Sequence, residues 1–161
     1  MKRLFSRVCL VLGLALTTAA VAVPVADAGP ASAAACPAKG TRFVTGTGPT
    51  VYLVGPSHDP SVSRLYVIPD PATYRALWGD GWEGIVTLPN VLNCWSRSYS
   101  LSGAYLTRVI GTEAVFIWDG NEGFRHIVNW DTFANRYRFS AAMIGWASQG
   151  TIDGARGPDW T

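Results

Sequence analysis

The sequence predicts an α+β fold: one small domain of two tandem ββα-like repeats, related by pseudo-twofold symmetry and closed by one disulfide bond. The repeats are indicated by residues 45–85 and 110–144, which carry the same succession of apolar runs, turn residues and aromatic positions at equal spacings. The disulfide is indicated by Cys36 and Cys94, the two cysteines that follow an apolar leader. Because each repeat is too short to bury a core by itself, residues 36–144 are expected to form a single domain.

Residues 1–35 are predicted to be a secretory signal peptide. Lys2, Arg3 and Arg7 precede an apolar stretch from Val8 to Val23, and small residues follow it. This order is typical of export signals, although an uncleaved amphipathic anchor is the alternative. The protein is therefore expected to be secreted and extracellular, without stable membrane insertion once the leader is removed. Cleavage is expected after one of three alanines: Ala28, Ala33 or Ala35.

Loss of the leader would make the chain electrically neutral. The whole sequence has a formal net charge of +2, but cleavage before Cys36 leaves ten lysines and arginines against ten acidic residues. The remaining basic residues form no run in the sequence. A neutral chain without a basic run gives no electrostatic reason to expect nucleic acid or an anionic membrane as a partner.

The cysteines agree with export. Cys9 lies in the leader, so Cys36 and Cys94 remain as a pair that would persist as a disulfide in an oxidising compartment. In the chain-entropy description, a bridge that closes a loop of this length stabilises the fold by about 4 kcal/mol. The rival hypothesis, a catalytic thiol, needs a histidine partner and a reducing environment.

Each repeat contains a predicted β-hairpin. Val51–Val54 and Val115–Trp118 are rich in β-branched and aromatic residues, as strands are. Asp119–Gly123 supplies glycine and asparagine, which adopt positive φ at little cost, so it predicts a tight hairpin turn. The first repeat has a longer loop there, Gly55–Ser63, at a hairpin tip where an insertion disturbs the core least. A further short strand is expected at residues 84–88, and strand is also expected at residues 43–44 and in the alternating stretch 99–110, which leads into the second hairpin.

A helix is predicted after each hairpin. Asp70 and Asn129 occupy equivalent positions and are both preferred N-cap residues, and Pro71 suits a first helical position. Glycines at 79 and 81 end the first helix. Residues 145–161 contain several glycines and a proline and are expected to form a flexible C-terminal tail. The buried helix stripes are expected to contain Tyr74, Leu77 and Trp78 in the first repeat and Trp130, Phe133 and Tyr137 in the second.

Part of this pattern resembles a known type of repeat. The Val51–Val54 strand, the segment Ile68–Tyr74 with the sequence IPDPATY, Trp82 with Ile85, and the linker Leu101–Thr107 are similar to a repeat of secreted, largely uncharacterised bacterial proteins, chiefly actinobacterial. The resemblance implies export and a tandem ββα-like module, and it implies no catalytic residue. The second repeat departs from the pattern because Val-Asn-Trp replaces the segment with two prolines at the helix entry.

Few residues suggest catalysis. Asp80 and Glu83 flank Trp82 and could act as the two acids of a glycosidase, but a solvated turn at the helix end is the favoured explanation, because Gly79 and Gly81 mark a loop there. His58 lies in the long hairpin loop and His126 lies on a strand, and no serine stands in a nucleophile elbow. The candidate catalytic residues are therefore Asp80, Glu83 and His58.

No metal or other cofactor is expected. Asp119, Asn121 and Glu122 place oxygen ligands at short spacing, but the later acidic ligand of a calcium loop is missing. A hairpin turn accounts for the same residues, because an Asp-Gly pair suits such turns.

The aromatic residues give the preferred functional hypothesis. All seven tryptophans follow the leader, and flat rings beside polar side chains are used by proteins to stack on sugars or to grip a protein partner. Trp82, Trp95 and Trp118 are less constrained by the helical pattern, so they are the candidate ligand-binding residues. Core burial is the alternative for each of them.

The sequence thus favours a secreted, non-enzymatic binding module that acts at or outside the cell envelope, with cell-wall carbohydrate or an extracellular protein as its partner. A small secreted hydrolase that uses Asp80 and Glu83 is the first alternative. A secreted inhibitor or interaction protein that presents the Gly55–Ser63 loop is the second alternative.

Overall fold

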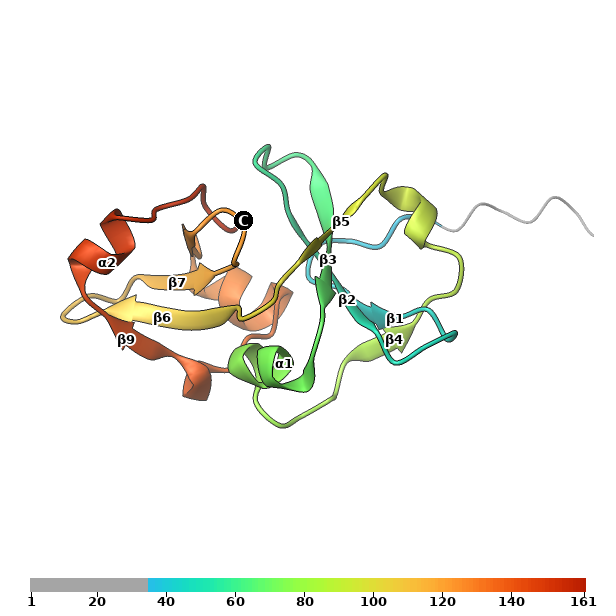
Figure 1. Ribbon diagram of the computed structural model, residues 1–161, viewed down its shortest axis with the longest axis horizontal. Coiled ribbons are helices and arrows are strands. Elements are labelled where there is room, and N and C mark those ends of the chain that lie inside the picture. The colour runs from blue at the N-terminus through green and yellow to red at the C-terminus, as the bar shows by residue number, and fades with distance from the viewer. Residues whose placement is uncertain (1–34) are drawn as a thin grey trace, which may run out of the picture. The chain divides into compact units, whose positions relative to one another are not determined.

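The computed structural model describes residues 35–161, and the expected signal peptide lies outside the described residues. These residues form a small mixed α+β domain that consists mostly of two β-sheets with a few short helices (Figure 1). A disulfide joins Cys36 to Cys94, as the sequence predicts. Within residues 35–161, no helix is long and apolar enough to cross a membrane.

The first sheet has five strands, and the hairpin β2–β3 lies at its centre. Strand β1 pairs antiparallel with β2, and β2 pairs antiparallel with β3. The two edge strands are joined in parallel, β4 to β1 and β5 to β3. In spatial order the strands are β4 (Ile85–Thr87), β1 (Arg42–Val44), β2 (Val51–Pro56), β3 (Ser63–Ile68) and β5 (Ser98–Ser100).

The second sheet has four strands in the same order as the first four strands of the first sheet. Strands β6 and β7 pair antiparallel, as do β7 and β8, and β9 joins β6 in parallel. The order β9-β6-β7-β8 therefore matches β4-β1-β2-β3, and the corresponding pairs of strands are parallel, antiparallel and antiparallel in both sheets. The strands are β8 (Phe124–His126), β7 (Val115–Trp118), β6 (Tyr105–Val109) and β9 (Gly145–Ala147).

Both predicted N-caps are confirmed. Asp70 Oδ1 accepts the N–H of Thr73 at 2.8 Å and so begins α1 (Pro71–Trp78). Asn129 Oδ1 accepts the N–H of Thr132 at 2.8 Å, at the start of the helical segment that contains η2 (Thr132–Arg136). This element is a single π-type turn, closed by the N–H of Tyr137 on the carbonyl of Thr132. Three shorter helices complete the structure: η1 (Leu92–Cys94), η3 (Ala141–Met143) and α2 (Gln149–Asp153).

Residues 145–161 are ordered into the domain, in contrast to the expected flexible tail. They contain β9 and α2, and they end with Trp160, which is fully buried. The backbone N–H of Trp160 donates to the carbonyl of His126 at 2.8 Å. The glycines and the proline of this segment shape its backbone, whereas burial of the indole fixes its position.

One apolar core is shared by both sheets. Tyr74, Leu77 and Trp78 of α1 pack in the same cluster as Phe133 and Tyr137, so these five predicted stripe residues are buried. The indole N–H of Trp78 donates to the carbonyl of Tyr137 at 2.9 Å and ties α1 to the second unit. Residues of both sheets and of α1 therefore belong to one core.

Trp130 is the exception among the predicted stripe residues. Its side chain is 60% exposed, so the prediction of burial was wrong. Trp130 stands one residue after the cap Asn129, where Pro71 stands in the first unit, and its ring stacks against Phe133 from the outside. A residue in the first turn leans over the entry of a helix, and here that places the indole at the surface.

Buried charge joins the second sheet to the hairpin of the first. The Arg125 side chain on β8 is fully buried and donates to the hydroxyl of Tyr66 at 2.9 Å and to the carbonyls of Pro158 and Asp159. Its charge is opposed by the carboxylate of Asp119, 3.4 Å away and also fully buried. Because a buried guanidinium is costly without partners, this network fixes the position of both sheets and of the C-terminal segment.

Candidate functional site

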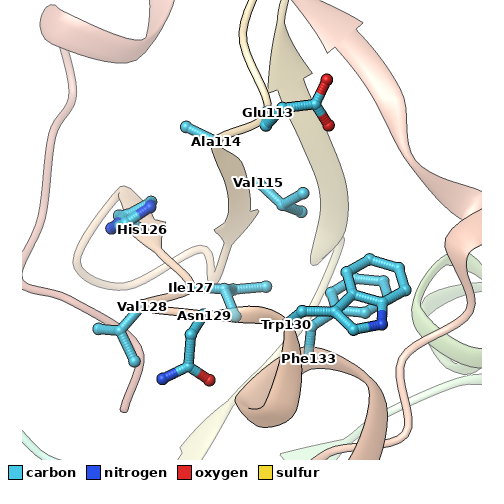
Figure 2. A pocket seen from close by; sticks show the side chains of 9 residues that line it. All are labelled: Glu113, Ala114, Val115, His126, Ile127, Val128, Asn129, Trp130 and Phe133. Atoms are coloured by element: carbon cyan, nitrogen blue, oxygen red, sulfur yellow. The ribbon is translucent and has the colours of Figure 1, made fainter.

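A cleft lies at the entry to the helical segment that contains η2 (Figure 2). It has a volume of about 570 Å³ and adjoins a smaller cavity of about 280 Å³, with which it shares Glu113, Val115 and Trp130. We call the two together the Trp130 cleft. Its larger part is lined by residues of three segments: Glu113, Ala114, Val115, His126, Ile127, Val128, Asn129, Trp130 and Phe133.

Local structure explains how these side chains meet. Strands β7 and β8 are antiparallel, so the start of β7 lies beside the end of β8. Residues 113–115 lie at or just before the start of β7. Residues 126–130 lead from the end of β8 into the helix. The backbone N–H of Ile127 donates to the carbonyl of Val115 at 2.9 Å and closes this end of the hairpin. The Trp130 ring lies against Phe133 with centroids 4.8 Å apart and planes 18° apart. One face of the indole is therefore supported by the core while the residue remains 60% exposed.

Polar groups stand around this aromatic platform. Asn129 uses its side-chain oxygen for the helix cap, and its NH₂ group has no hydrogen-bond acceptor among residues 35–161. Glu113 forms no ion pair within the same residues. In the smaller part of the cleft, the Arg108 guanidinium lies over the ring of Trp146, 3.9 Å from its centroid. The cleft thus combines a flat apolar surface with exposed polar groups that make no hydrogen bond or ion pair to other described protein groups at these atoms.

Another cleft, of about 340 Å³, lies between the start of β2, the end of β3 and the entry of α1. Its exposed aromatic residue is Trp82, which is 46% exposed and stacks on Tyr74 at 4.1 Å and 12°. The supporting ring lies in a helix in both clefts: Tyr74 in α1 and Phe133 in η2. The exposed tryptophan differs in its position along the chain, because Trp82 follows α1 whereas Trp130 precedes η2.

The tryptophans predicted to bind a ligand differ in their exposure. Trp82 lines the cleft of the first unit, as expected for a residue that could contact a ligand. Trp95 is half-buried, lies near-parallel to Phe43, and donates its indole N–H to Ser63 Oγ at 3.2 Å. Trp118 is half-buried against Phe124. Trp95 and Trp118 are therefore largely engaged in packing.

Two tryptophans of the second unit escaped the sequence analysis. Trp130 was assigned to the buried stripe, and Trp146, which is 58% exposed, was assigned to the tail. The signal that could have found Trp130 is its place at the first helical position, where the first unit has Pro71. A position that one repeat fills with proline needs no buried side chain.

The candidate catalytic residues are spread over separate surfaces. Asp80 has a 93% exposed side chain and pairs with Arg75 at 3.1 Å. Glu83 is exposed, and its carboxylate lies over Gly81. His58 lies at the tip of the β2–β3 hairpin, with Nδ1 3.4 Å from Glu122 Oε1. None of the three lines either of the clefts described above.

The Asp119–Glu122 segment is a hairpin turn with a structural carboxylate. Asp119 Oδ1 accepts the backbone N–H groups of Asn121 and Glu122 at 2.9 and 2.7 Å, and its Oδ2 faces Arg125. Within the described residues, no group of three or more His, Cys, Asp or Glu side chains is arranged to hold a metal ion.

The chain matches no protein-family model, no curated protein and no solved structure. Any functional conclusion therefore depends on the geometry of the site itself.

Proposed function

We propose that the protein is a secreted, non-enzymatic binding module that holds a carbohydrate of the cell envelope in the Trp130 cleft. The observation that carries this proposal is the exposed indole of Trp130, supported on one face by Phe133 and bordered by polar groups without partners. A flat ring stacks on the apolar face of a sugar, and nearby donors and acceptors bind the hydroxyl groups at its edge.

The size and polarity of the cleft support a ligand of this class. A volume of about 570 Å³ lies within the usual range of small-molecule sites, about 300–1,000 Å³. Asn129 offers an N–H donor, Glu113 offers acceptors, and Arg108 lies in the adjoining cavity. Trp146, which is exposed and lies under the Arg108 guanidinium, is a second exposed indole next to a residue of the adjoining cavity.

The same proposal includes the origin of the fold. The matching strand orders and the equivalent clefts support two copies of one ββα-like unit with a pseudo-twofold relation. The Cys36–Cys94 bridge supports an oxidising, extracellular location and agrees with the resemblance to repeats of secreted bacterial proteins. The hydrolase alternative has less support, because Asp80 is paired with Arg75 and stands in solvent.

The proposal is tested by retention on insoluble polymers. The full chain is expressed in a secreting bacterial host, and the protein is purified in the form that the host produces. It is then incubated separately with peptidoglycan, chitin and cellulose, and the bound fraction is measured by sedimentation. Trp130→Ala is expected to weaken binding by about 30-fold, which corresponds to about 2 kcal/mol for a central aromatic contact.

Tyr105→Ala is the matched control, because Tyr105 is also an exposed aromatic residue, 41% exposed, that packs on a core ring, Phe124, but lines neither of the clefts described above. It should leave retention on the polymer unchanged. Equal retention of Trp130→Ala and the unaltered protein, or no retention on any polymer, would contradict the proposal. Melting curves of both variants exclude unfolding as the cause of a loss.

A further inference from the structure

We propose that a second cleft, distinct from the Trp130 cleft, binds a phosphate group. This cationic cleft has a volume of about 320 Å³ and lies between the N-terminal part of the domain and the end of η2. Four of the residues that line it are cations, Lys39, Arg42, Arg136 and Arg138, and no acidic residue lines it. These residues form no basic run in the sequence, because they come from two segments almost a hundred positions apart that the fold brings together.

The four cations form no ion pair with a carboxylate in the described part of the chain. Four other arginines do: Arg64, Arg75, Arg125 and Arg156. Arg97 and Arg108 are also unpaired there, but they do not line this cleft. Positive charge gathered in one concave surface that no acidic residue lines attracts an anion.

Arg42 forms the floor of this cleft and is only 5% exposed. It donates to neutral groups, the hydroxyl of Tyr74 at 2.6 Å and the backbone carbonyl of Glu83 at 2.8 Å, and its guanidinium lies over the ring of Trp78. Burial lowers the pKa of Arg42; the Arg138 charge acts in the same direction, while Tyr74 and the Glu83 carboxylate oppose it. A guanidinium with neutral partners in a buried place remains electrostatically unsatisfied, and a bound anion would compensate it.

Arg42 and Arg138 converge on one point, above the backbone of Gly84. If Gly84 carried a Cβ, that atom would lie 3.0 Å from Arg138 Nη1 and 3.1 Å from Arg42 Nη2. Gly84 also has φ of +77°, which disfavours any other residue. The glycine therefore leaves room for two guanidinium groups side by side, the arrangement that can bind several oxygens of one anion.

The backbone of Arg138 provides an independent indication of function. Arg138 has φ of +52°, in the left-handed region, and lies just after η2. The N–H of the next residue, Phe139, donates back to the carbonyl of Phe133 and closes the end of this helical segment. This geometry is the usual glycine position of a helix C-terminus, and the first unit has Gly79 at the equivalent place with φ of +76°. An arginine kept in a strained conformation where glycine fits better indicates a role for its charge.

The charge and the donors favour phosphate over a lone carboxylate. A single arginine satisfies a carboxylate with two parallel hydrogen bonds, whereas this cleft offers two converging guanidinium groups, a third at Arg136 and the ammonium of Lys39. Lys39 donates to the carbonyl of Pro60, which leaves two of its three N–H groups for a ligand. A phosphate group has the negative charge and the number of acceptor oxygens that this set requires.

Calorimetric titration of the full chain with inorganic phosphate tests the proposal, with ionic strength held constant by sodium chloride. Arg138→Gly and Arg136→Gln are each expected to weaken phosphate binding by about tenfold or more, the usual effect of losing one charge-assisted contact. Arg97→Gln is the matched control, because it removes the same charge from an exposed arginine outside the cationic cleft, and it should change affinity less than about twofold. Arg138→Gly relieves the backbone, so its melting temperature should be unchanged or higher, which separates lost binding from unfolding.

Vesicles distinguish a free phosphate from a lipid headgroup as the source. If a headgroup is bound, mixed vesicles of phosphatidylglycerol and phosphatidylcholine will sediment the protein, and vesicles of phosphatidylcholine alone will not. The Arg138→Gly variant will then sediment with neither kind of vesicle. If free phosphate is bound, calorimetry will show binding and neither kind of vesicle will sediment the protein. The proposal is overturned if neither phosphate nor phosphatidylglycerol binds above the chloride background, or if Arg138→Gly binds as tightly as the unaltered protein.

Discussion

The buried indole of Trp160 provides a quantitative test of how the C-terminal segment holds the two sheets together. Trp160 has no exposed surface although it is the residue before the C-terminal Thr161. Its ring contacts Tyr66 of the first sheet, with centroids 5.3 Å apart, and Tyr137 of the second unit, 5.4 Å apart. The Arg125 guanidinium lies 4.9 Å from the ring centroid. Trp160→Ala would remove all of these contacts at once.

The magnitude follows from the buried area. A tryptophan buries about 200 Å², which at about 25 cal/mol per Å² is worth about 5 kcal/mol as an upper value. Alanine retains part of that burial, whereas the remaining cavity and the lost contact with Arg125 increase the cost. The expected loss in the free energy of unfolding is therefore about 4 kcal/mol, a large share of the total stability of such a domain, about 5–15 kcal/mol. For a domain of this size the melting temperature should fall by about 15 °C.

Urea unfolding followed by tryptophan fluorescence and circular dichroism measures this loss. Trp146→Ala is the matched control, because it makes the same chemical change at a residue of the same terminal segment that is 58% exposed, and it should cost less than about 1 kcal/mol. Trp160→Phe should cost less than half as much as Trp160→Ala, because the indole N–H has no acceptor among residues 35–161 and only ring volume is lost. Equal urea midpoints for Trp160→Ala and Trp146→Ala would refute the reasoning, because they would show that residues 145–161 contribute little to the stability of the domain.

Two further outcomes are expected. The Cys36→Ser and Cys94→Ser double variant should lose about 4 kcal/mol of unfolding free energy, because the bridge spans a sequence separation of 58, and unchanged denaturation midpoints would contradict this. The pKa of Glu122 lies below its usual range, since burial raises it but the Arg64 hydrogen bond and the Arg125 and Arg64 charges lower it more. Its contribution is therefore present above about pH 4.3, the usual glutamate value, and is lost as the pH falls through the folded-state pKa. Glu122→Gln should reduce the loss of melting temperature between pH 6 and pH 3, and an identical pH profile would count against this prediction.

Local features of the fold were predictable from the sequence because they depend on neighbouring residues. The caps at Asp70 and Asn129 require only a side-chain oxygen and a free N–H three residues later, and both are present. The hairpin turn at 119–123 requires residues that accept positive φ, and both of its glycines adopt it. The Cys36–Cys94 pairing followed from having two cysteines after the leader.

Exposure of the aromatic residues was less predictable. The helical period placed Trp130 on the buried stripe, but the helical turn of the second unit is short and π-type, so the period that assigns faces does not apply at its first residue. Trp82 was expected to be exposed and lines a cleft, whereas Trp95 and Trp118 are partly covered by partners that lie far away in the sequence or across a turn.

The sequence by itself determined the mixed α+β class, strands before residue 145, the turns and the disulfide, because each of these depends on residue type and on short-range spacing. Tertiary structure alone decided that residues 145–161 belong to the domain, that Trp130 is exposed beside Glu113 and Asn129, and that Lys39, Arg42, Arg136 and Arg138 share one cleft. The physical reason is that burial and electrostatic potential depend on distances between residues that are far apart along the chain. The packing of the two sheets around one core sets those distances.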